Sequence, residues 1–125
     1  MTRGVEWLAG LLEGEGCFTR QRTQSGKTTP LVQIVMTDRD VVDEAVRLMS
    51  GIGGRAMTRR IQPLPSGKNA HRASFTGLPA ARVMWAIYPF MGDRRARDIR
   101  SVLTDWTPRV YTEAVAFRAE IGGLL

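Results

Sequence analysis

The sequence predicts an α+β fold in which one antiparallel sheet of four strands carries helices on one of its faces. Segments with helical and strand-like periodicity follow one another in the order helix, two strands, helix, two strands, helix, and then a helical tail. Within each strand pair, a short segment rich in Gly, Ser or Pro favours a turn. With 125 residues, 43% of them apolar, the chain can form a single domain over residues 1–125, and hardly two.

The first half of the chain is predicted to form a short helix, two strands and a longer helix. In the first helix, over Val5 to Leu12, three leucines share one face, and two glycines follow it closely. The strands are predicted at Cys17 to Gln24 and Leu31 to Met36. Asp38 is of a residue type that often caps helices, and it precedes apolar residues at helical spacing that end at Gly51.

The second half is predicted to form two further strands and then three helices. Strands are predicted at 55–62 and 71–76 around a loop at 63–69, and helices at 79–88, at 93–106 and from 107–108 to 122–123.

The charge balance favours a polyanionic partner. Lys and Arg total 18 against 12 Asp and Glu, which gives a net charge of +6, and most of the cations are Arg. Because the planar guanidinium suits phosphates and guanine edges, nucleic acid is the first candidate partner and an anionic membrane the second. Codon usage in a high-GC genome explains the arginines equally well. A sheet face that the helices leave bare would suit DNA binding.

Other features disfavour several classes of protein. The single cysteine, Cys17, excludes an internal disulfide and a cysteine-rich zinc site, and it suits a reducing compartment. We find neither a signal-peptide pattern nor an apolar stretch long enough to cross a bilayer, so we expect a cytoplasmic location and no membrane partner. The sequence has no Gly-Lys-Ser/Thr phosphate loop, so we expect no nucleotide cofactor.

The most specific motif lies at the end of the first predicted helix. Residues 8–16 read Leu-Ala-Gly-Leu-Leu-Glu-Gly-Glu-Gly, and Cys17-Phe18 follow. This segment resembles the LAGLIDADG motif of the homing endonucleases, with Leu12 in place of Ile, Gly14 in place of Ala, and Glu13 and Glu15 in place of the two Asp. The predicted order of helices and strands resembles that family as well.

The resemblance implies a metal-dependent enzyme that cuts double-stranded DNA at a long, pseudo-palindromic site. In the family the second acid of the motif binds the metal, which assigns Glu15 as catalytic and metal-binding, with Gly14 beside it. Mg²⁺ is the expected cofactor, with Ca²⁺ or Mn²⁺ as substitutes in crystals. Since the sequence has one copy of the motif, the resemblance implies a homodimer. Its predicted interface is Leu8, Gly10, Leu11 and Leu12.

A weaker match lies in the segment from Tyr88 to Arg95, which resembles the family's Pro-Phe-Leu segment and the basic active-site residue after it. The spacing favours Arg94 as that basic residue, with Arg95 next. The family often has a polar residue at the end of its second strand, where this chain has Met36. This departure leaves the water-ordering role open, with Thr37 or Arg39 as substitutes.

Strand alternation selects the residues expected to contact DNA. If Phe18, Ile34 and Phe75 point toward the helices, their neighbours point the other way, and we expect Arg55, Met57 and Arg59 on one side of their strand and Arg60 on the other. Each charged residue among them also fits a solvated surface position. The predicted DNA-binding residues are Thr19, Arg20, Gln21, Arg22, Gln33, Arg55, Arg59, Arg72 and Ser74.

Two alternative functions remain open from the sequence. The first is a DNA-binding regulator or an RNA maturase that keeps this fold without nuclease activity. The second is a small globular protein whose basic charge is incidental. Neither the target sequence, nor the overhang, nor whether the gene belongs to an intron or an intein follows from the residues.

Overall fold

The computed structural model describes residues 3–104, 106–108 and 111–120, and it confirms the predicted αββαββα order. The elements are α1 (Val5–Glu15), β1 (Gly16–Arg22), β2 (Thr28–Met36), α2 (Arg39–Gly53), β3 (Thr58–Pro63), β4 (Asn69–Thr76), α3 (Leu78–Ile87), the 3-10 helix η1 (Tyr88–Phe90), α4 (Asp93–Leu103) and α5 (Tyr111–Glu120).

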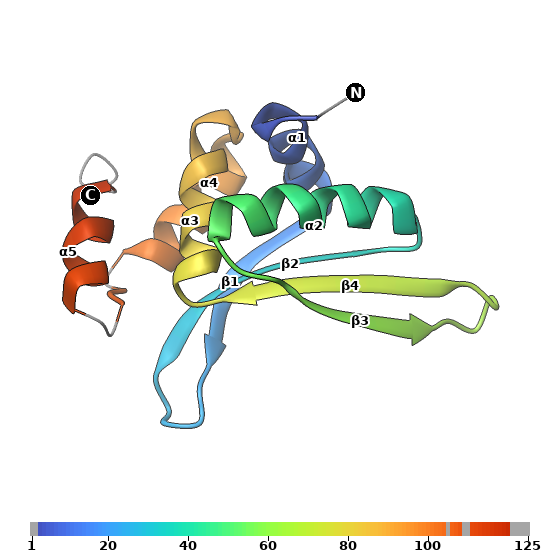
Figure 1. Ribbon diagram of the computed structural model, residues 1–125, viewed down its shortest axis with the longest axis horizontal. Helices are drawn as coiled ribbons and strands as arrows, with labels where there is room; N and C mark the ends of the chain where they lie inside the picture. Colours follow the sequence, from blue (N-terminus) through green and yellow to red (C-terminus); the bar gives the residue numbers. More distant parts are fainter. Residues whose placement is uncertain (1–2, 105, 109–110, 121–125) are drawn as a thin grey trace.

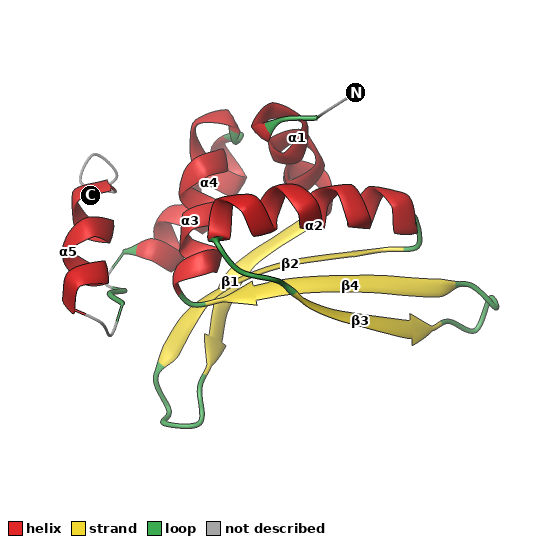
Figure 2. Ribbon diagram, in the orientation of Figure 1, coloured by secondary structure: helices red, strands yellow, loops and turns green. Residues whose placement is uncertain are grey.

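The four strands form one sheet in the order β1-β2-β4-β3, and all neighbouring strands are antiparallel. Figure 1 shows the two strand pairs as long hairpins that extend in different directions. Helices α1 to α4 lie on one side of the sheet, and the opposite side carries no helix among the described residues (Figure 2). In the strand order β1-β2-β4-β3, the two edge strands are β1 and β3.

The core lies between the sheet and these helices. Val32, Ile34 and Ala73 point from the sheet into it and are fully buried. The helices complete it with the buried apolar side chains of Leu8 and Leu12 from α1, Val42, Ala45 and Met49 from α2, Val83, Met84 and Ile87 from α3, and Ile99 and Leu103 from α4.

Helix α1 passes directly into β1 at Gly16, without an intervening loop. The Gly16 amide donates to the carbonyl of Leu12, and a Cβ at this position would lie 2.7 Å from that carbonyl oxygen. Any side chain larger than hydrogen would therefore displace the junction. This close approach fixes the end of α1 at the start of the sheet.

Several predicted boundaries differ from the structure. Helix α2 does not end at Gly51 but continues to Gly53, and Gly54 then adopts a left-handed conformation with φ +78°. As a result β3 begins at Thr58, three residues after the predicted start at Arg55. Asp38 precedes α2, but its side chain makes no capping hydrogen bond.

Other differences lie at the ends of elements. Strand β1 ends before Gln24, and β2 begins before Leu31. Helix α4 ends at Leu103 because Thr104 is extended, so the predicted continuation to Trp106 is wrong. The last helix begins at Tyr111, and its predicted end at 122–123 lies outside the described residues. In the described part of the chain, no helix is both long and apolar enough to cross a bilayer.

Candidate nucleic-acid interface and the end of the first helix

The side of the sheet opposite the helices, called the open face below, is formed by alternate residues of the four strands. One cross-strand row runs through Cys17, Gln33, Ser74 and Thr58, which are register partners on β1, β2, β4 and β3. These residues are exposed or half-buried, whereas Val32 and Ile34 beside Gln33 are fully buried. The open face is therefore polar and accessible.

The open face also concentrates positive charge. Arg60 of β3 and Arg72 of β4 are direct register partners, so two guanidinium groups project from neighbouring positions. Like charges placed opposite each other on adjacent strands destabilise a sheet. None of the four strands contains an Asp or a Glu that could neutralise them. An anion bound on this face would offset the repulsion.

Five of the residues predicted to bind DNA lie on the open face. The register places their side chains on the side opposite the buried residues, and their role in binding stays a prediction. They are Thr19, Gln21, Gln33, Arg72 and Ser74. Arg22 is exposed at the end of β1, next to the hairpin turn.

Arg20 does not belong to this set. It shares the helix side of β1 with Phe18, where its Nε donates to the Val102 carbonyl at 2.9 Å and its Nη2 donates to the Thr104 carbonyl. These carbonyls lie at the C-terminal end of α4, where helix carbonyls lack partners and a cation is favoured. Arg20 thus fastens α4 to β1 on the helix side of the sheet, and its predicted contact with DNA stays a prediction.

Arg59, another predicted DNA contact, also lies on the helix side of the sheet. It pairs with the buried Ala73, and its Nη2 lies 2.6 Å from Oδ1 of Asp43 on α2. Arg60, which was left out of the predicted contacts, is the residue on the open face. Arg55 lies in the connection before β3 and is not part of the sheet. The predicted opposite orientation of Arg59 and Arg60 is confirmed, whereas Arg55 and Met57 precede the strand, and the pairing with β4 shows which side faces the helices.

Glu15 is the last residue of α1, and its side chain is exposed. Two residues later Cys17 begins the open face, so Glu15 lies at the β1 edge of that face, and the adjacent arginines lie on β4 and β3 of the same sheet. The carbonyl of Glu13 accepts a hydrogen bond from Arg95 Nε at 3.0 Å. Arg94, which the sequence favoured, is exposed, whereas Arg95 is the residue that contacts the motif.

The end of α1 has donors that suit a hard divalent cation. Carboxylate and carbonyl oxygens are the ligands that Mg²⁺ prefers, and the C-terminal end of a helix carries partial negative charge. The carbonyls of Leu12 and Glu13 already accept bonds from Gly16 and Arg95. The described residues contain no cluster of three His, Cys, Asp or Glu side chains, and the assignment of Glu15 and Gly14 as metal-binding stays a prediction.

The predicted dimer surface of α1 is only partly available. Leu8 and Leu12 are fully buried within the chain's own core, so neither is accessible on the surface of the single chain, and their place in an interface stays a prediction. Gly10 and Gly14 lie on the opposite, exposed side of the helix, and a Cβ at either position would meet nothing within 4 Å. Leu11 is half-buried beside them. Gly10 and Leu11 remain predicted contacts.

Comparisons with known proteins identify a structural neighbour. No family model matches the sequence, and no curated protein matches it significantly. The LAGLIDADG meganuclease I-AabMI, solved bound to uncleaved DNA, is similar in structure, with a TM-score of 0.57 and 18% sequence identity. The match covers 82% of this chain and 35% of that chain, so this chain corresponds to little more than a third of that protein. The chain therefore has the α+β fold of a LAGLIDADG meganuclease, with αββαββα order and a four-stranded antiparallel sheet.

Proposed function

We propose that the protein is a site-specific endonuclease that binds double-stranded DNA on the open face and cuts it as a homodimer with Mg²⁺. One observation carries the proposal: the exposed carboxylate of Glu15 ends α1 directly beside a polar sheet face that has two adjacent arginines and no acid. DNA that lies on this face would pass close to the carboxylate.

The open face supports DNA binding through the types of its side chains. Arg and Gln can each make paired hydrogen bonds to a base edge in the major groove, Arg with guanine and Gln with adenine. Gln33 and Arg72 are on the central strands, where a duplex seated on the sheet would be contacted most closely. The structural neighbour was itself solved with DNA bound.

A dimer is proposed because one chain provides one carboxylate of this kind. Gly10 and Gly14 lie one helical turn apart and leave room for the backbone of a second α1 to approach. A two-fold axis beside this face of α1 would bring two Glu15 residues to the same region of the duplex, one for each strand. Most of the I-AabMI chain lies outside the match, which leaves enough length for a second domain of this size.

In the proposed reaction, the residues of this chain hold and orient the reactants. The sheet fixes the position of the duplex, and Arg95 fixes the end of α1 through the Glu13 carbonyl. Glu15 would hold a divalent cation, which supplies charge neutralisation at the phosphate and an activated water. The scissile phosphate would be placed by the sheet contacts on either side of it.

The test compares Glu15→Gln with Glu6→Gln, which removes an exposed carboxylate from the opposite end of the same helix. A plasmid library of random sites is incubated with protein and Mg²⁺, and the cut ends are sequenced. We expect Glu15→Gln to lose cleavage while it keeps its affinity for duplex DNA, and Glu6→Gln to cut like the wild type. Sedimentation of the DNA complex should give two chains per duplex.

Cleavage by Glu15→Gln at the wild-type rate would contradict the proposed site. Tight duplex binding by the wild type, with no cut product from any library member, would favour a DNA-binding regulator. A single chain per duplex in active complexes would contradict the dimer.

A further inference from the structure

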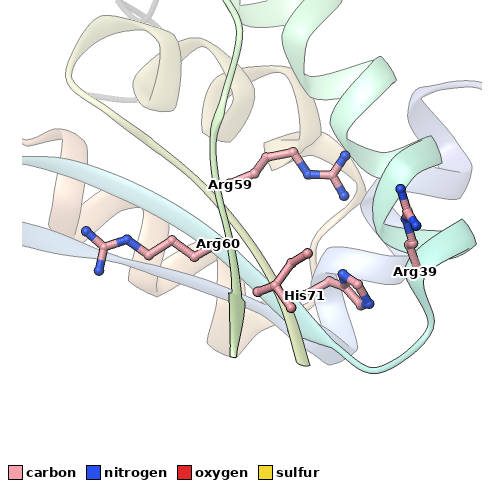
Figure 3. A pocket seen from close by; sticks show the side chains of 5 residues that line it. Arg39, Arg59, Arg60 and His71 are labelled. Atoms are coloured by element: carbon pink, nitrogen blue, oxygen red, sulfur yellow. The ribbon is translucent and has the colours of Figure 1, made fainter. Parts of the chain in front are cut away.

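A second basic surface lies on the helix side of the sheet, at the edge formed by β3. Here a hollow of about 420 Å³ is lined by Arg39, Arg59, Arg60, Ile61 and His71. Figure 3 shows the side chains of Arg59 and His71 on the side of β3 that faces α2, and that of Arg60 on the other side. The hollow therefore lies at the β3 edge of the sheet, next to the open face.

Two of the guanidinium groups that line the hollow, those of Arg39 and Arg59, share one carboxylate. Asp43 of α2 pairs with Arg59 at 2.6 Å, and its other oxygen lies 3.8 Å from Nε of Arg39. Asp38 and Asp40 flank Arg39 in the sequence but do not line the hollow. Both arginine side chains remain accessible, at 73% for Arg39 and 40% for Arg59. They keep free donors and an excess of positive charge for an anion.

Sheet dimensions indicate which anion would reach this edge. Three inter-strand spacings of about 4.8 Å place β1 and β3 roughly 14 Å apart. The major groove of B-DNA is about 12 Å wide, and phosphates line both of its sides. A four-stranded sheet is therefore wider than the groove, and a duplex on the open face would place a sugar-phosphate backbone near each edge strand.

The exposed side chain of Ile61 also fits a sugar-phosphate backbone as the ligand. It lies on the helix side of β3 as the register partner of His71, and it is 63% exposed. It is the most exposed of the large apolar residues in the described part of the chain. An apolar side chain between cationic ones matches a backbone in which deoxyribose alternates with phosphate.

We propose that this hollow binds a DNA backbone phosphate at the β3 edge, through Arg59 and Arg39, with Ile61 against the adjoining deoxyribose. The inference rests on the proposed function, because it takes the duplex to lie on the open face. Asp43 holds the two guanidinium groups in place before DNA arrives. The contact adds affinity and register without reading a base.

The test uses two charge-neutral double variants of α2. Asp43→Ala/Arg59→Ala removes the pair at the hollow. Glu44→Ala/Arg47→Ala removes an ion pair of α2 away from the hollow, in which Arg47 donates to Glu44 at 2.7 Å and thereby lowers the pKa of the Glu44 carboxyl. Arg47 lies about 200° around the helix from the buried Ala45, so the control pair lies away from the sheet. Thermal unfolding checks that both variants fold.

Affinity for a duplex of arbitrary sequence is measured from about 50 to 200 mM salt, because each phosphate contact adds roughly 0.9 to the slope of log affinity against log salt. We expect the slope of Asp43→Ala/Arg59→Ala to fall by about 1, with no change in preference among sequences. The control pair should keep the wild-type slope. Arg39→Ala, at a well-exposed position that should tolerate the change, should show a similar fall, with Arg47→Ala as its control.

Equal slopes for wild type and Asp43→Ala/Arg59→Ala would overturn the inference and leave the Arg59–Asp43 pair as a purely structural contact. Equal falls for both double variants would also overturn it, because the effect would then not be local. If the wild type binds no duplex at low salt, the proposed function itself fails. The two failures are thus distinguishable.

Discussion

The two faces of the sheet are built from the same strands, yet they differ in every property that bears on function. On the covered face, Phe18, Val32 and Phe75 are almost completely buried against helices. On the open face, their neighbours Thr19 and Gln33 are accessible. Because successive side chains of a strand point to opposite sides, a single residue step separates a role in the core from a role at the surface.

The arginines show that one residue type has different partners on the two faces of the sheet. Arg59 and Arg60 are adjacent in the sequence, but Arg59 pairs with Asp43 on the helix side whereas Arg60 lies beside Arg72 on the open face. Arg20, on the covered side of β1, fastens α4 to the sheet. Residue type alone therefore does not indicate function here, because the face on which an arginine lies decides its partner.

The largest expected effect is a loss of stability when the side chain of Phe75 is removed from the covered face. Phe75→Ala removes a buried ring from the covered face and should reduce the free energy of unfolding by about 3–5 kcal/mol. Thr76→Ala, one residue later and exposed, should stay within about 0.5 kcal/mol of the wild type. Denaturant titration measures both. Similar losses for the two variants would contradict the assignment of the faces.

A second prediction separates stability from binding. Arg72→Ala should weaken binding to the preferred duplex by about 1–3 kcal/mol without a matching loss of stability, because its side chain lies on the open face. Arg20→Ala should do the reverse and lower the free energy of unfolding by about 1 kcal/mol, since the α4 carbonyls lose their donor.

Duplex affinity and thermal unfolding, measured on both of these variants, test the separation. The prediction is contradicted if Arg20→Ala loses more preference among DNA sequences than Arg72→Ala does.

The smallest expected effect concerns the outer side of α2. Arg47 donates to Glu44 and holds the pKa of this carboxyl below its usual value of 4.5. Because the pKa is lower in the folded chain, the stabilisation is present above pH 4.5 and is lost as the pH falls through the lowered value. Glu44→Gln should thus reduce the melting temperature slightly at pH 7 and not in strong acid. A difference in melting temperature between Glu44→Gln and the wild type that is the same at every pH would point to packing as its cause.

Much of the fold could be predicted because it depends on local patterns. The alternation of Val32, Gln33 and Ile34 predicted a strand with two different sides, and the leucines of α1 predicted a helix with one apolar side. Element ends were less predictable, because Gly51 has a residue type that often ends helices and yet lies inside α2. There, packing of the following turn against the sheet outweighs the preference of a single glycine.

The order of elements, the motif that ends in Glu15 and Gly16, and the excess of arginine follow from the amino-acid sequence. Which arginines reach the open face, the burial of Leu8 and Leu12 in the core, and the contact of Arg95 with the end of α1 follow from the packing of the folded chain. The physical reason is that periodicity acts over a few neighbouring residues. Strand register and helix docking depend on contacts between residues far apart in the chain, which no local pattern specifies.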